Sequence, residues 1–174
     1  MKSYMKTMSH PLTAVIASAL ITSSAHAGDL IVSFVESAPK DRFTIANQTG
    51  CDLSASEIVL DLSQSAAGLI FDTTGAGAGV EVFQPFEIVA GAALLASVPD
   101  VSDGQNAVAL NFKDFPADAE LRFTVDVDDT LKASSLGQIR VSRSEISGAV
   151  VQLGTMTAQF DETATARLPV SCES

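Results

Sequence analysis

The feature that most constrains the fold is a succession of short apolar or alternating segments, each followed by residues that favour turns. In residues 120–127, the side chains of Leu121, Phe123, Val125 and Val127 share one face, and polar residues occupy the other. Segments of this kind recur about every 8–12 residues, as in sandwiches and barrels, and no amphipathic helix is evident. We therefore predict an all-β fold, a single antiparallel two-sheet β-sandwich of about ten to thirteen strands. The expected strands lie near residues 30–35, 42–47, 57–62, 68–72, 80–83, 86–89, 94–98, 107–112, 120–127, 138–142, 149–153, 155–160 and 164–170.

Residues 1–27 have the organisation of a secretory signal peptide. Lys2 and Lys6 precede an apolar segment, residues 12–21, that is too short to span a bilayer. The small-x-small sequence Ala25-His26-Ala27 follows, so we predict cleavage after Ala27 and one β-sandwich domain over residues 28–174. The product would be exported, to the periplasm or the extracellular space, and no later apolar run is long enough for a membrane span.

Cleavage would remove most of the side chains that could perform catalysis. Both histidines and the only tyrosine precede residue 27, and the sequence contains no tryptophan. Without an imidazole, the exported chain could form neither a Ser-His-Asp or Cys-His catalytic site nor the common zinc sites. We therefore expect no catalytic residues and no enzyme activity. A carboxylate-dependent hydrolase is the less favoured alternative, because the acids show no distinctive pair.

The exported chain would be strongly acidic. Removing 27 of the 174 residues leaves 147, with 8 basic and 21 acidic side chains and a net charge of −13. This balance argues against binding to nucleic acid or to anionic membranes, which requires clustered Lys and Arg. We expect a surface, glycan or protein partner whose identity the sequence does not give.

Two cysteines, Cys51 and Cys172, remain after the predicted cleavage. An even number of cysteines in an exported chain favours a disulfide. The bond would tie the C-terminal tail to an early turn. Two free thiols are the alternative.

Clustered acids near the end of the strongest predicted strand suggest a cation site. Asp126 and Asp128 are two residues apart, so they lie on one face of a strand, and Asp129 begins the next turn. Calcium is bound by six to eight oxygen atoms, many of them from carboxylates. We therefore predict Asp126, Asp128 and Asp129 as candidate Ca²⁺ ligands. Residues 100–104 form a second small acidic turn, and Asp114 with Asp118 forms a third. The alternative is that all of these acids only cap turns and solvate strand ends.

Two other motifs carry weaker predictions. Residues 126–130 match the D-x-D-x-T signature of haloacid-dehalogenase-type phosphatases, but that family places it on the first strand of an α/β fold, and only strands are expected here. The sequence Gly75-Ala76-Gly77-Ala78-Gly79 lacks the lysine and the helix of a phosphate-binding P-loop. We expect it to be a loop or a tight crossover between the sheets.

Residues 68–87, 122–131 and 144–149 resemble segments of small exported bacterial proteins of the aggregation factor core type, a name taken from sponge aggregation factors. The resemblance implies calcium-dependent cell adhesion in an extracellular assembly, and it assigns no role to individual residues. We therefore expect an exported, non-catalytic binding or adhesion module of the cell surface or matrix. A periplasmic ligand-binding β-sandwich is the alternative.

Overall fold

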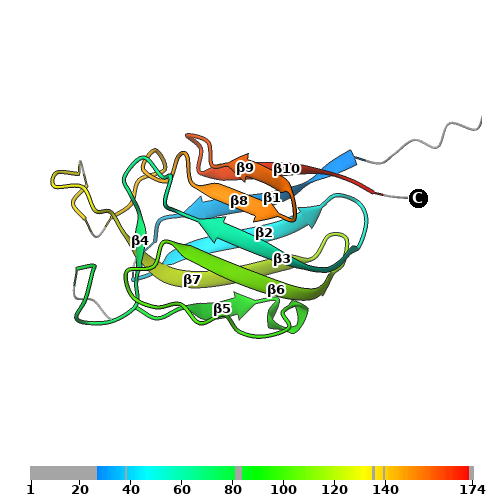
Figure 1. Cartoon of the computed structure of the whole chain (residues 1–174), viewed down its shortest axis with the longest axis horizontal. Helices are drawn as coiled ribbons and strands as arrows, with labels where there is room; N and C mark the ends of the chain where they lie inside the picture. The colour runs from blue at the N-terminus through cyan, green and yellow to red at the C-terminus, as the bar shows by residue number, and fades with distance from the viewer. Residues whose placement is uncertain (1–26, 38, 81–83, 135, 139, 173–174) are drawn as a thin grey trace, which may run out of the picture.

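The computed structural model describes residues 27–37, 39–80, 84–134, 136–138 and 140–172. They form two antiparallel sheets packed face to face, which confirms the predicted β-sandwich (Figure 1). The predicted signal peptide lies outside the described residues, except that Ala27 is the first residue of the first strand. Its cleavage remains a prediction.

The first sheet has the strand order β10-β1-β2-β7-β4, and β5 also pairs with β7. The second sheet has the order β6-β3-β8-β9. The strands are β1 (Ala27–Val35), β2 (Asp41–Gln48), β3 (Leu53–Asp61), β4 (Ile70–Asp72), β5 (Glu87–Ala90), β6 (Ala107–Phe115), β7 (Glu120–Asp128), β8 (Val150–Leu153), β9 (Met156–Gln159) and β10 (Thr165–Ser171).

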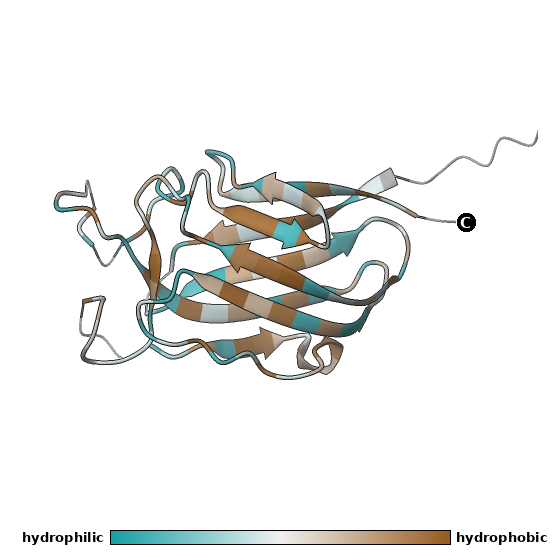
Figure 2. Cartoon of the chain, in the orientation of Figure 1, coloured by the Kyte–Doolittle hydropathy of each residue, from teal (hydrophilic) through white to brown (hydrophobic). Residues whose placement is uncertain are grey.

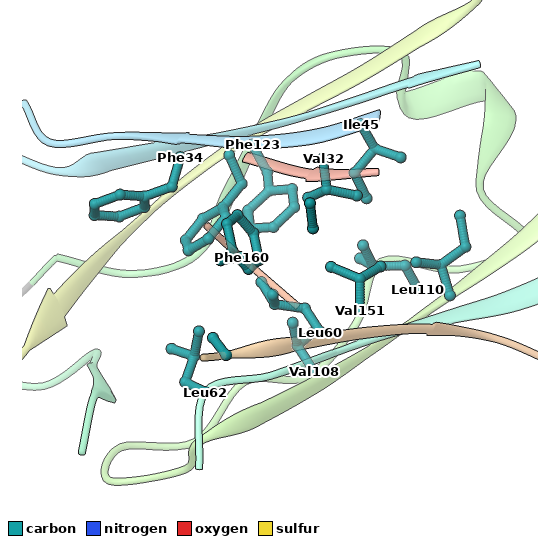
Figure 3. Close-up of a cluster of buried hydrophobic side chains, with 14 of the residues drawn as sticks. Val32, Phe34, Ile45, Leu60, Leu62, Val108, Leu110, Phe123, Val151 and Phe160 are labelled. Carbon is teal, nitrogen blue, oxygen red and sulfur yellow. The ribbon is translucent and has the colours of Figure 1, made fainter. Parts of the chain in front are cut away.

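Alternation along the strands produces the core between the sheets. Along most strands, apolar and polar residues follow one another (Figure 2), and the apolar ones are buried. Val32, Phe34, Ile45 and Phe123 point from the first sheet towards side chains of the second, among them Leu60 (Figure 3). These side chains are almost completely buried, so hydrophobic burial between the two layers is the main stabilising force.

Phenylalanines fill much of this core, as expected for a sandwich without tryptophan. Phe43 and Phe123 lie opposite each other on β2 and β7, and their rings stack at 5.2 Å. Phe115 is fully buried and stacks on Phe112 at 4.7 Å.

Strand β4 is short but is paired on both of its edges. It pairs with the end of β7 on one side. On the other, the Phe71 N–H donates to the Gln105 carbonyl at 2.7 Å, and the Gly104 N–H donates to the Phe71 carbonyl at 2.9 Å. The turn at residues 102–105 is therefore fixed beside β4.

Two predicted strands differ in the structure, and a third cannot be compared. Residues 94–98 do not form a strand. Leu94 is the last residue of a 3-10 helix, Ala92–Leu94, and Leu95 makes a single bridge to Phe112. The reason is a turn at Gly91, whose φ of 78° does not fit an extended strand. The described part of residues 138–142 contains no strand, and Val141 packs into the core from a loop. Residues 81–83 lie outside the described residues, and Val80 belongs to a loop.

The predicted disulfide is present. Cys51 and Cys172 are joined across a sequence separation of 121 residues. Asn47 holds the adjoining turn, because its buried side-chain amide donates to the carbonyls of Cys51, Phe115 and Pro116 at 2.7–3.0 Å. The bond thus anchors the end of β10 to a turn already fixed to the core.

Removing this disulfide should destabilise the fold strongly. For a loop of this length, the chain-entropy model gives a contribution of about 4–5 kcal/mol. In urea unfolding, the double variant Cys51→Ser/Cys172→Ser should lose a free energy of unfolding of about that size. Wild-type protein with reductant should behave like the variant. A loss below about 1 kcal/mol would contradict the entropic account.

Candidate metal centre

The site begins with the alternation of β7. Val125 and Val127 point into the core, so Asp126 and Asp128 lie on the outer face of the first sheet. Strand β4 pairs antiparallel with this part of β7 and places Asp72 directly opposite Asp126. One carboxylate oxygen from each of Asp72, Asp126 and Asp128 lies within 4.8 Å of the other two. We call these three residues the acidic cluster.

The acidic cluster is buried although it lies on an outer sheet face. Exposed fractions are 1% for Asp72 and Asp128 and 5% for Asp126. Both carboxylate oxygens of Asp72 and Oδ1 of Asp128 have no hydrogen-bond partner. Like charges opposite each other on neighbouring strands are destabilising, and burial without partners adds a further cost. The arrangement therefore favours a bound cation or bound protons.

No basic side chain of the described residues neutralises the acidic cluster. The ion pairs among the described residues join Lys40 to Glu87, Arg122 to Glu120, Arg140 to Glu36 and Arg167 to Asp29. None of them includes a residue of the acidic cluster. Three buried carboxylates with free oxygens and no cationic partner are a donor set that could hold a metal ion.

Burial also makes these acids retain protons. Burial, reinforced by the charges of Asp128 and Asp72, raises the pKa of Asp126 to about 7. Burial raises the pKa of Asp128 to about 6, and it raises the pKa of Asp72, with the neighbouring Asp103 carboxylate adding to the effect. A bound divalent cation would replace these protons, because metal ligands must be deprotonated.

Asp41 lies on the inner side of the same region. Its carboxylate accepts hydrogen bonds from the backbone N–H groups of Ser37 and Val127, each at 3.2 Å. Burial nevertheless raises the pKa of Asp41 to about 8, and the charge of Asp126 contributes. Because both oxygens of Asp41 are occupied, we assign it to holding the turn before β2 and not to the acidic cluster.

The glycine-rich loop, residues 73–80, covers the acidic cluster. The Val80 N–H donates to Oδ2 of Asp128 at 2.7 Å. Gly79 lies directly against Asp72, and a Cβ atom added there would overlap the Asp72 carboxylate. The predicted loop is confirmed, but the sequence did not indicate that the loop covers carboxylates.

The predicted calcium ligands are only partly brought together. Asp126 and Asp128 belong to the acidic cluster. Asp129 is buried beside them, with Oδ1 accepting from the Leu131 N–H at 2.9 Å and Oδ2 unpartnered, but it is not one of the three converging carboxylates. The sequence analysis missed Asp72. In the sequence, Asp72 is recognisable only as an acid that follows a short apolar segment. Its proximity to Asp126 comes from the pairing of β4 with β7.

The other acidic turns have different roles. Asp103 accepts three backbone N–H bonds from the glycine-rich loop. Asp100, Asp114 and Asp118 are exposed. The phosphatase interpretation of residues 126–130 loses its basis, because this motif ends the seventh strand of a β-sandwich.

Two adjoining hollows, of about 480 and 370 Å³, share part of their lining, and the disulfide cysteines Cys51 and Cys172 line the smaller one. Both are lined by Ser56, Leu153 and Met156. They are the concave surfaces that a small ligand could use.

Comparison of the chain with protein-family models, with curated proteins and with solved structures gives no match. No helix in the described part of the chain has the length and apolar character needed to cross a membrane.

The buried acids predict an unusual dependence of stability on pH. The pKa of Asp41 rises from its ordinary 3.8 to about 8 on folding. Between these pH values the folded chain keeps the proton and the unfolded chain loses it, so the free energy of unfolding falls as pH rises. Asp126 and Asp128 act in the same direction. With a chelator present, we expect a higher Tm at pH 5 than at pH 8.

The variant Asp41→Asn provides the check, because it cannot titrate. Its Tm in chelator should change less between pH 5 and pH 8 than that of the wild type. Thermal melts followed by circular dichroism at several pH values measure how Tm changes with pH in the variant and in the wild type. A wild-type Tm that rises steadily from pH 5 to pH 8 would contradict the assignment.

Proposed function

We propose that the protein is an exported, non-catalytic binding or adhesion module of the cell surface or matrix, and that its sandwich is completed by Ca²⁺ at the acidic cluster. One observation carries the metal assignment: Asp72, Asp126 and Asp128 are buried together, with free oxygens and no basic partner. The Cys51–Cys172 bond supports an oxidising, extracytoplasmic location.

The chemistry of the donors favours calcium. All three side chains offer oxygen, which hard cations prefer. Zinc sites normally use His or Cys, but no histidine follows His26 and both cysteines form the disulfide. Mg²⁺ usually keeps several of its waters, whereas Ca²⁺ accepts many protein oxygens in flexible geometry. A site closed by a backbone loop leaves little room for retained water, so Ca²⁺ fits it better.

The adhesion part of the proposal rests on the resemblance to aggregation-factor-core-type proteins together with the calcium site. The alternative is a periplasmic ligand-binding protein, which the two hollows beside the disulfide support. The two functions differ in where contacts form. An adhesion module contacts a partner across a surface, whereas a ligand-binding protein encloses a small molecule.

Calcium should stabilise the protein measurably. At a calcium concentration of about 100 times Kd, mass action gives about 2.7 kcal/mol. For a chain of this size, that corresponds to an increase in Tm of roughly 5–10 °C. Melts with 5 mM CaCl₂ and with chelator should differ by about this amount. Equal Tm values in the two conditions would contradict the calcium site.

The variant Asp126→Asn should lose this increase and should also melt higher than the wild type in chelator at pH 8. The reason is that the substitution removes a negative charge directly opposite that of Asp72 on the neighbouring strand. A variant that merely failed to fold would not show a higher Tm in chelator together with a lost calcium response. The control is Asp114→Asn, which removes the same charge from an exposed position and should keep the calcium response.

Self-association tests the adhesion proposal. Sedimentation velocity over a hundredfold range of protein concentration should show association that requires calcium and is weakened in Asp126→Asn. A wild type that stays monomeric at every concentration, with and without calcium, would contradict adhesion between copies of this chain.

A further inference from the structure

The glycine-rich loop is held in place almost entirely by polar contacts. Residues 74–78 are exposed and carry only Thr, Gly and Ala side chains, which bury little apolar surface. The hydrophobic core therefore contributes little to the position of the loop. What fixes it is the set of hydrogen bonds that its backbone makes to two acids, Asp103 and Asp128.

Asp103 makes most of these bonds. Its Oδ1 accepts from the N–H groups of Thr73 at 3.0 Å and Thr74 at 3.2 Å, and its Oδ2 accepts from the Ala78 N–H at 2.8 Å. These N–H groups, that of Ala78 first, lower the pKa of Asp103 to about 2. Both ends of the loop are thus joined to one carboxylate, which the turn at residues 102–105 fixes beside β4.

The docked loop is also what closes the acidic cluster. Gly79 lies against the Asp72 carboxylate, and Val80 donates to Asp128. Docking therefore removes water from carboxylates that repel one another. Without a cation, the docked loop would enclose uncompensated charge, which is costly. With a cation, the same enclosure strengthens the attraction between the ion and the carboxylates.

We propose that the glycine-rich loop is a calcium-dependent cover of the acidic cluster, and that Asp103 is the positioning residue that couples loop docking to ion binding. This inference rests on the proposed calcium site. Asp103 is not assigned as a ligand, because the backbone of the loop occupies both of its oxygens. Since coupling is reciprocal, an ion that favours docking is itself bound more tightly when the loop is docked.

The first test uses the wild-type chain. Hydrogen exchange of the four bonded loop amides, those of Thr73, Thr74, Ala78 and Val80, should be slow with calcium and fast with chelator, while the amides of β1 and β2 should stay protected in both. Equal protection of the loop in the two conditions would overturn the inference. This measurement needs no variant to fold.

The second test measures calcium affinity by isothermal titration calorimetry. Asp103→Ala keeps all three carboxylates of the acidic cluster, but it removes three loop bonds together with a charge that acts on Asp72. Coupling energies of the usual size predict a Kd roughly 5- to 150-fold weaker for this variant, and this result is read together with the exchange of the loop amides. Its Tm in chelator should stay close to that of the wild type, because the loop is already undocked there. A merely structural role would lower the Tm equally with and without calcium.

Asp161→Ala is the matched control. Asp161 also accepts three hydrogen bonds within a turn, from the Thr163 N–H and hydroxyl and from the Thr165 N–H, but it does so between β9 and β10. This variant should melt lower in both conditions and keep the wild-type Kd.

The outcomes separate the inference from the proposed function. A wild type that binds no calcium would contradict the proposed site itself. A wild type that binds calcium, with an unchanged Kd in Asp103→Ala, would leave the site in place and overturn the coupling. A weakened Kd together with calcium-dependent protection of the loop supports both.

Discussion

The candidate metal centre and the loop that covers it depend on one pairing, Asp72 of β4 opposite Asp126 of β7, with Asp128 beside them. An antiparallel pair that places two acids opposite each other is unfavourable, and burial makes it more so. Yet the neighbouring backbone encloses these side chains: β4 is paired on both edges, and the glycine-rich loop lies over them. A bound cation, as proposed, would turn this unfavourable arrangement into a favourable one, and it would account for an enclosing loop whose residues have almost no side chain.

The two ends of the sandwich are stabilised by different forces. Near the disulfide, Asn47 and the Cys51–Cys172 bond fasten the chain to a core of apolar side chains. At the β4 end, the loop and turn that cover the first sheet are held by hydrogen bonds to carboxylates. The apolar core contains none of the proposed calcium ligands, so on the proposed calcium site the loss of the ion should loosen one end and leave the sandwich folded. Local change of this kind is what a cation-dependent contact surface requires.

Much of the fold was predictable from the sequence, because strand alternation is a local property. The side chains of residues 120–127 face as predicted, and the same period of two placed Asp126 and Asp128 on one face. The role of Asp72 was not predictable, because it arises from pairing between segments more than 50 residues apart in the sequence. Asp129 was assigned as a ligand from its neighbours, but its carboxylate does not converge with theirs. The role of Asp103 was not predictable either, because in the sequence it is one acid in a short polar turn. Only the folded structure shows that the backbone of the glycine-rich loop donates to its carboxylate.

A crystal structure of the protein grown with calcium tests the central claim most directly. The account predicts one ion bound by oxygens of Asp72, Asp126 and Asp128 at about 2.3–2.6 Å, the range of Ca²⁺–oxygen distances in proteins. It also predicts that the glycine-rich loop closes over that ion. Calcium-saturated crystals in which these three carboxylates contact only water or one another would contradict it.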